Sequence, residues 1–219
     1  MNAGRGWLVP LTGIAGVVIL LAGFFIGGEP PDLSDDRARE FVDFYSDNQD
    51  RLFLGAAFQG VAVTLLVFFF ACIRRLISAA EGGRGILASV AFGGGLIFAA
   101  GGAFDATLTF AMAETAEDLP PQSLLALSAL FENDFVPLAV GLQLFLLGVG
   151  LAAWRFGVLP KWLAGIALLL GVIAVTPIGF VSFIAMVLWI PITSILLALA
   201  AKRGGPDAHH MSESARSDI

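Results

Sequence analysis

The chain has few of the residues on which metalloproteins and disulfide-bonded proteins depend. It contains one cysteine, Cys72, and two histidines, which are adjacent at His209 and His210 near the C-terminal end. A single cysteine excludes an intramolecular disulfide and any multi-cysteine zinc or iron–sulfur site. Because no histidine lies in an apolar segment, haem, di-metal or zinc-hydrolase chemistry within those segments is not expected either.

Charge is also scarce. Only 14% of the 219 residues are charged, whereas 58% are apolar, and soluble domains usually carry about one quarter charged residues. The chain has no Gly-x-Ser-x-Gly elbow, no phosphate-binding loop and no His-Glu-x-x-His motif. We therefore expect no catalytic residues, no cofactor and no nucleic-acid partner, and an enzyme is the least expected class of function.

What the chain has instead is long apolar stretches. A helix rises about 1.5 Å per residue and the hydrocarbon layer is about 30 Å thick, so one crossing needs around 20 apolar residues. Six stretches qualify, although the third is over-long and the fifth is short: residues 7–28, 52–73, 86–113, 135–154, 162–176 and 178–201. The sequence thus predicts an all-α membrane protein, with a six-helix transmembrane bundle over 1–201 and a disordered tail over 202–219.

The basic residues predict the orientation of this bundle. Nine of the twelve fall at the two ends of the chain or in every second connection between stretches, and the other three are Arg37, Arg39 and Arg51. Basic residues concentrate on the cytoplasmic side of membrane proteins. We therefore expect a multi-pass protein of the cell membrane with both termini in the cytoplasm.

Two connections on the other side contain helix signals. Ser34 is a good N-cap for a short helix that continues to about Asp47, in which Phe41, Phe44 and Tyr45 share one face. A second short helix is predicted over 122–131, after Pro120 and Pro121. Such helices lie on the membrane surface or cover the bundle, and a gating lid is the alternative for the first.

The third apolar stretch carries small residues at every fourth position. This spacing predicts a continuous groove on one helix face into which a neighbouring helix can pack closely. The residues are Ala91, Gly95, Ala99, Ala103, Thr107 and Ala111.

Three polar side chains, Gln59, Asp105 and Gln143, lie inside apolar stretches. Counted from the outer ends of their stretches, they lie about 10–12 Å deep, so they could form one layer in the outer half of the membrane. An isolated charged aspartate in hydrocarbon is unfavourable by a few kcal/mol. We therefore expect Asp105 to face the bundle interior and to form a hydrogen bond with one or both glutamines. The layer either holds the helices together or forms an outward-facing site for a proton, a cation or a small ligand.

Glu132, Asn133 and Asp134 precede the fourth stretch. They are typical of residues that cap the start of a helix. With Asp105 nearby, they could instead form an acidic outer mouth that concentrates cations.

The run Gly157–Gly165, together with Gly6–Pro10 and the segment Phe41–Arg51, resembles patterns in small six-helix membrane proteins of actinobacteria that form a domain-of-unknown-function family. The resemblance implies the same six-span plan and no activity. Two classes of function fit these observations best. One is a non-enzymatic accessory subunit or a binder of a small apolar, lipid-like ligand, and the other is a small carrier or channel. Membrane lipids, a second copy of the chain or a larger membrane complex are the expected partners.

Overall fold

The protein is helical throughout the part of the chain that the structure describes. The computed structural model describes residues 3–28, 38–83 and 85–203, and no strand occurs in these ranges. Backbone amides in a membrane have no water to bond, and a helix satisfies them internally. The elements in chain order are η1 (Ala3–Leu11), α1 (Thr12–Gly27), α2 (Ala38–Asp47), α3 (Gln49–Ala80), α4 (Leu87–Thr115), α5 (Pro121–Glu132), α6 (Phe135–Phe156), α7 (Lys161–Ile173) and α8 (Phe180–Arg203).

Five helical segments are long and apolar enough to cross a membrane: Trp7–Gly27, Gln49–Ala80, Leu87–Thr115, Pro121–Phe156 and Phe180–Lys202. The predicted all-α class is confirmed, and five of the six predicted spans correspond to these segments. The stretch predicted over 162–176 corresponds to α7, which has 13 residues and is therefore only about 20 Å long.

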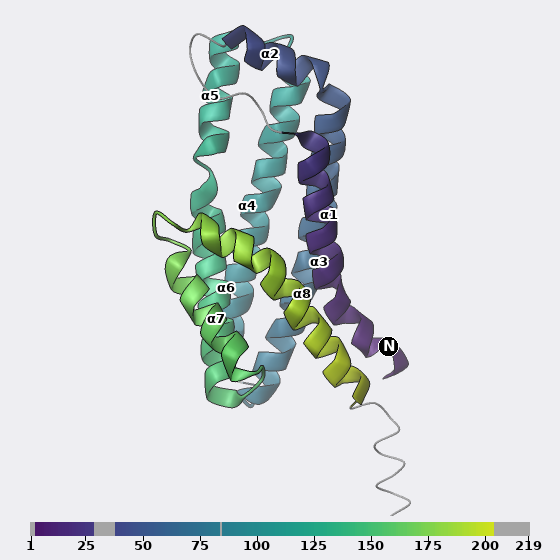
Figure 1. Ribbon diagram of the computed structural model, residues 1–219, viewed down its shortest axis with the longest axis vertical. Coiled ribbons are helices and arrows are strands. Elements are labelled where there is room, and N and C mark those ends of the chain that lie inside the picture. Colours follow the sequence, from purple (N-terminus) through teal and green to yellow (C-terminus); the bar gives the residue numbers. More distant parts are fainter. Residues whose placement is uncertain (1–2, 29–37, 84, 204–219) are drawn as a thin grey trace, which may run out of the picture.

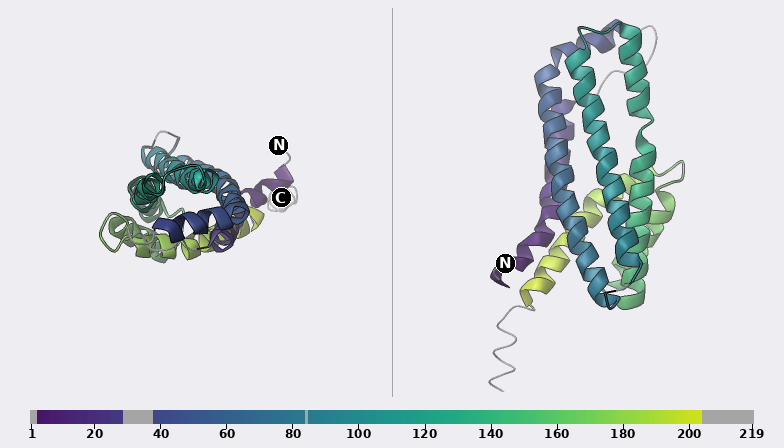
Figure 2. Two further views of the ribbon diagram at one scale, coloured as in Figure 1. Left: turned by 90° about the horizontal axis from the view of Figure 1, so that it is seen from above. Right: turned by 180° about the vertical axis from the view of Figure 1, so that it is seen from behind.

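The long helices pack side by side (Figure 1). Ala3 and Arg203, the first and last described residues, lie at one end of the bundle, and α2 lies across the opposite end (Figures 1 and 2). We call these the termini end and the α2 end. Exposed basic residues on the helix segments nearest the termini end are Arg74, Arg75, Arg155, Lys161 and Lys202.

Large apolar side chains cover much of the outside of the bundle. Phe24 on α1 is 70% exposed, and Ile184 and Leu188 on α8 are 64% and 67% exposed. Contiguous apolar surface of this kind is unfavourable in water and is typical of a face that contacts lipid.

Helix α4 lies between α3 and α6, and glycine makes its contact with α6 close. A Cβ added at Gly94 would lie 2.8 Å from the carbonyl oxygen of Gly141 and 2.7 Å from Leu144 Cβ. Conversely, a Cβ at Gly141 would lie 2.7 Å from Phe98 Cα and 2.9 Å from the Gly94 oxygen. Only glycine therefore allows the two backbones to touch at this crossing.

The groove predicted from every fourth residue of this helix is only partly correct. Ala91, Gly95 and Ala99 are buried, but Ala103 and Thr107 are exposed. Four residues turn a helix by about 400°, so a four-residue stripe drifts by about 40° at each step and leaves the contact face.

Helices α7 and α8 form a hairpin along the termini half of the bundle. Ser182 Oγ of α8 donates to the Leu170 oxygen of α7 at 2.8 Å, and Trp189 Nε1 donates to the Leu163 oxygen at 3.3 Å. Helix α8 packs on η1 and α1, while α7 packs on α6. The turn that joins them ends partway along the bundle and does not reach α2 (Figure 1).

At the α2 end, Phe41 and Tyr45 of α2 are each 2% exposed and pack in a cluster of apolar residues from α3, α4 and α5. The predicted amphipathic helix is thus present, and it covers the bundle. Its predicted N-cap, Ser34, lies outside the described residues. The second short helix, predicted over 122–131, is confirmed as α5.

The structure also moves the boundary between the bundle and the predicted tail. The tail was expected to begin at 202, but α8 continues through Lys202 and Arg203. The rest of the predicted tail, with His209 and His210, lies outside the described residues.

Candidate functional site

The structure brings Gln59 and Asp105 together. Gln59 lies on α3 and Asp105 on the antiparallel α4, and Gln59 Nε2 donates a hydrogen bond to Asp105 Oδ2. Both side chains are half-buried. The predicted bond between Asp105 and a glutamine is therefore confirmed for Gln59. No arginine or lysine in the described ranges forms an ion pair with this carboxylate.

Gln143 does not join this pair, and the predicted three-residue layer is wrong in that respect. The antiparallel contact of α4 with α6 places Gly101 against Leu138 and Gly94 against Gly141. Asp105 lies four residues beyond Gly101 on α4. Because the two helices are antiparallel, the residue at the same level lies about four residues before Leu138, which is Asp134. Gln143 is nine residues further along α6, or about 13 Å away along the helix axis.

The break between α5 and α6 places Asp134 near the pair instead. Asp134 Oδ2 is buried and accepts no hydrogen bond among the described residues, and the charge of Asp105 acts on this carboxyl group. Asp134 occupies the N-cap position of α6, but its side chain makes no capping bond. The predicted capping role is therefore incorrect for this residue.

The other two residues of the predicted acidic mouth lie differently. Glu132 and Asn133 are exposed, and Asn133 Nδ2 donates to the Ala129 oxygen of its own helix at 2.7 Å. Of the three, only Asp134 has a buried carboxylate oxygen. The arrangement is a pair of carboxylates, Asp105 and Asp134, flanked by one amide.

Tyr45 of α2 belongs to this site, although sequence reasoning placed it only on an apolar face. Burial raises the pKa of Tyr45, and the nearby charges of Asp105 and Glu132 raise it further. The phenol therefore stays neutral in this acidic surrounding. Its position as the only tyrosine of the chain, on a face otherwise made of phenylalanine, was the one signal that could have identified it.

The site offers oxygen atoms and one amide but little for a metal ion. In residues 3–28, 38–83 and 85–203, no group of three or more His, Cys, Asp or Glu side chains could hold one. Two carboxylates, an amide and a phenol can bind a proton, a small cation or a hydrogen-bonding head group.

Comparisons of this chain with protein-family models, with curated proteins and with solved structures found no match. The resemblance to actinobacterial six-helix proteins thus stays a prediction.

Proposed function

We propose that the chain is a non-enzymatic protein of the cell membrane that binds a lipid-like amphiphile, with the polar head of the ligand on Gln59 and Asp105. The observation that carries this proposal is the half-buried Gln59–Asp105 pair. Its carboxylate has no basic partner in the described residues, and it lies on long apolar helices. A hydrogen-bond donor or a cation is the chemistry that complements a carboxylate.

The orientation in this proposal follows from charge. Five exposed basic residues lie toward the termini end, whereas Arg39 and Arg51 are the exposed basic residues described near the α2 end. The positive-inside rule then puts the termini in the cytoplasm and α2 outside. The Gln59–Asp105 pair lies in the outer half of the bundle under this orientation.

The α7–α8 hairpin gives the ligand a way in. Residues 174–180, which form its turn, carry no charged side chain, so the turn is compatible with hydrocarbon. Six helices are then embedded, and the last two turn back before the outer surface. The hairpin stops partway along the bundle and does not run beside the outer part of α4 (Figure 1). Exposed Phe104 and Val61, on the same parts of α4 and α3, suit the apolar part of an amphiphile.

The test compares ligands with one chain length and different heads. The protein, in nanodiscs of zwitterionic phospholipid, is titrated with a long-chain amine, the matching alcohol and the matching carboxylate, and thermal unfolding is followed by labelling of Cys72. A ligand at one hundred times its Kd stabilises by about 2.7 kcal/mol, which is roughly 5–10 °C for a chain of this size. We expect this shift for the amine, a smaller one for the alcohol and none for the carboxylate.

Asp105→Asn removes the charge but keeps an oxygen that can accept the bond from Gln59. It should abolish the advantage of the amine. Glu117→Gln is the matched control, because Glu117 is an exposed acid just beyond α4. Equal responses in the two variants would refute a ligand site at Asp105.

A carrier of protons or small cations is the second candidate. Asp134 favours it, because its buried Oδ2 has no hydrogen-bond partner among the residues that the structure describes and the charge of Asp105 acts on it. Two neighbouring carboxylates readily share a proton or a cation. Proteoliposomes with an internal pH dye distinguish the two functions. Proton or cation flux that Asp105→Asn abolishes would establish the carrier, and absence of flux together with amine binding would support the binder.

A further inference from the structure

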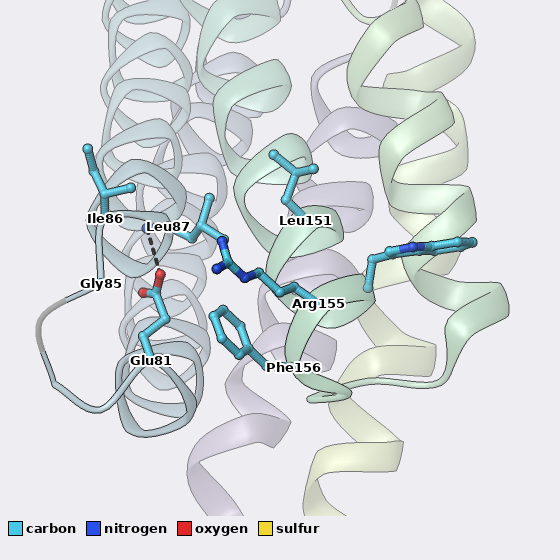
Figure 3. A pocket seen from close by; sticks show the side chains of 8 residues that line it. Glu81, Gly85, Ile86, Leu87, Leu151, Arg155 and Phe156 are labelled. Atoms are coloured by element: carbon cyan, nitrogen blue, oxygen red, sulfur yellow. Dashed lines mark hydrogen bonds between the residues drawn. The ribbon is translucent and has the colours of Figure 1, made fainter.

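A second feature lies at the other end of the bundle. A pocket of about 640 Å³ opens between the start of α4 and the end of α6. Leu87 and Leu151 form apolar parts of its wall, and Glu81, Arg155 and Phe156 lie around it (Figure 3). It shares no residue with the Gln59–Asp105 site.

Arg155 gives this pocket a positive charge. Its side chain extends from α6 toward Leu87 (Figure 3), and its guanidinium carbon lies 5.4 Å from the centre of the Phe156 ring. It forms no ion pair with a carboxylate in the described residues. Glu81, the acid in the lining, keeps its negative charge, but its carboxylate oxygens accept bonds from the backbone amides of Leu87 at 3.1 Å and Ala88 at 2.9 Å and do not pair with Arg155.

The rest of the pocket is apolar and continuous with the lipid-facing surface. Leu151 is 48% exposed and Ile86 72% exposed, and both line the pocket. An occupant must therefore combine a negative head with an apolar chain that arrives from the membrane. A guanidinium suits phosphate because it offers paired donors and a fixed charge.

We infer that this pocket binds an anionic phospholipid of the cytoplasmic leaflet, with its phosphate on Arg155 and an acyl chain along Leu151 and Leu87. Basic pockets between membrane helices on the cytoplasmic side bind such head groups. The inference rests on the proposed membrane orientation, but not on ligand binding at Asp105.

The test measures lipid preference by native mass spectrometry of the detergent-solubilised protein, with phosphatidylglycerol and phosphatidylcholine of equal chain length. The wild-type protein should retain phosphatidylglycerol preferentially. Arg155→Gln should weaken phosphatidylglycerol binding roughly fivefold to tenfold, as loss of one interfacial charge contact predicts. Arg155→Lys should keep much of the preference, because it retains the charge.

Two further variants separate a built pocket from a charged surface. Leu151→Trp fills the apolar part without a change of charge and should reduce binding of both lipids. Lys202→Gln removes one positive charge at the same end, outside the pocket lining, and should leave the preference intact. Equal losses in Arg155→Gln and Lys202→Gln, or no loss in Leu151→Trp, would overturn the inference.

Two additional arms identify the source of the anion and separate the two proposals. Inorganic phosphate should not displace phosphatidylglycerol, and displacement would indicate a site for a soluble anion and overturn the lipid assignment. Asp105→Asn should bind phosphatidylglycerol as the wild type does. A loss in that variant would show that the retained lipid lies at the Gln59–Asp105 site, and would contradict the Arg155 pocket.

Discussion

The contact of Gly94 with α6 allows a sharp test of the packing, because an adjacent glycine serves as its control. A Cβ at Gly94 would lie 2.7 Å from Leu144 Cβ and 2.8 Å from the backbone oxygen of Gly141. Ordinary contacts begin at 3.4 Å, so relief of the Leu144 contact alone requires a shift of about 0.7 Å (3.4 − 2.7 Å). The added Cβ would lie closer still to the backbone nitrogen of Phe145. A Cβ at Gly93, one residue earlier in α4, would meet no atom within 4 Å.

The two substitutions should therefore have opposite signs. Overpacking of this kind costs about 1–3 kcal/mol, and α4 cannot yield easily because α3 packs against it as well. Alanine in a helix is intrinsically better than glycine by about 0.5–1 kcal/mol. Gly93→Ala should gain that amount. Gly94→Ala should lose about 1–2 kcal/mol net, so the variants should differ by about 2 kcal/mol or more.

Cys72 provides the assay, because it is the only cysteine and is half-buried in α3. A thiol-reactive fluorophore reports unfolding as the temperature rises, with both variants in the same detergent. A difference of about 2 kcal/mol corresponds to roughly 4–8 °C in Tm, with Gly94→Ala the lower. If Gly94→Ala melts at or above the temperature of Gly93→Ala, the two backbones are not in contact, and the register of α4 against α6 is incorrect.

Two other predictions concern charge and capping. Tyr45 is the only tyrosine, and its pKa is raised by burial. The stability that this shift contributes is therefore complete below the ordinary tyrosine pKa near 10 and is lost as pH rises above that value. Ultraviolet absorbance should show no phenolate in the folded protein at pH 10, and an ordinary titration would contradict the burial of Tyr45. Glu81→Gln removes one of the two carboxylate oxygens that accept bonds from the first amides of α4. It should lower the free energy of unfolding by about 1 kcal/mol, which is about 2–4 °C in the Cys72 assay. The control Glu117→Gln should leave the melting temperature unchanged.

The positions of the helices could be predicted from the sequence because a membrane helix needs a long apolar run with polar ends. Pro120 and Pro121 also marked the start of α5 correctly, since proline fits the first turn of a helix. The Gln59–Asp105 bond was predicted by counting residues from the outer ends of the two apolar stretches. This count was reliable here because α3 and α4 are joined by a short turn. A short turn fixes the register of two neighbouring helices.

The same count failed for Gln143 because α4 and α6 are not joined by a short turn. Their connection contains α5, a helix of 12 residues, and the depth of Gln143 was measured from Phe135 on the assumption that all helices end at one level. The structure instead sets the register through Gly94 and Gly141. For Asp134, the local capping signal was misleading, because its side chain makes no capping bond. The alternative prediction, which set this residue near Asp105, agrees with the effect of the Asp105 charge on its carboxyl group.

The half-buried position of Asp105 explains why α4 tolerates an aspartate. A buried charge without a partner is unfavourable by several kcal/mol, but Asp105 is only half-buried and accepts a hydrogen bond from Gln59. Helices α7 and α8 pack mainly on other helices, α7 on α6 and α8 on η1 and α1. The groups that bear on Asp105 come instead from α3, which carries Gln59, and from the start of α6, where the charge of Asp105 acts on Asp134. A count of apolar residues gives the depth of a side chain in its own helix but not which helices are neighbours, so it predicted the bond to a glutamine and not the position of Gln143.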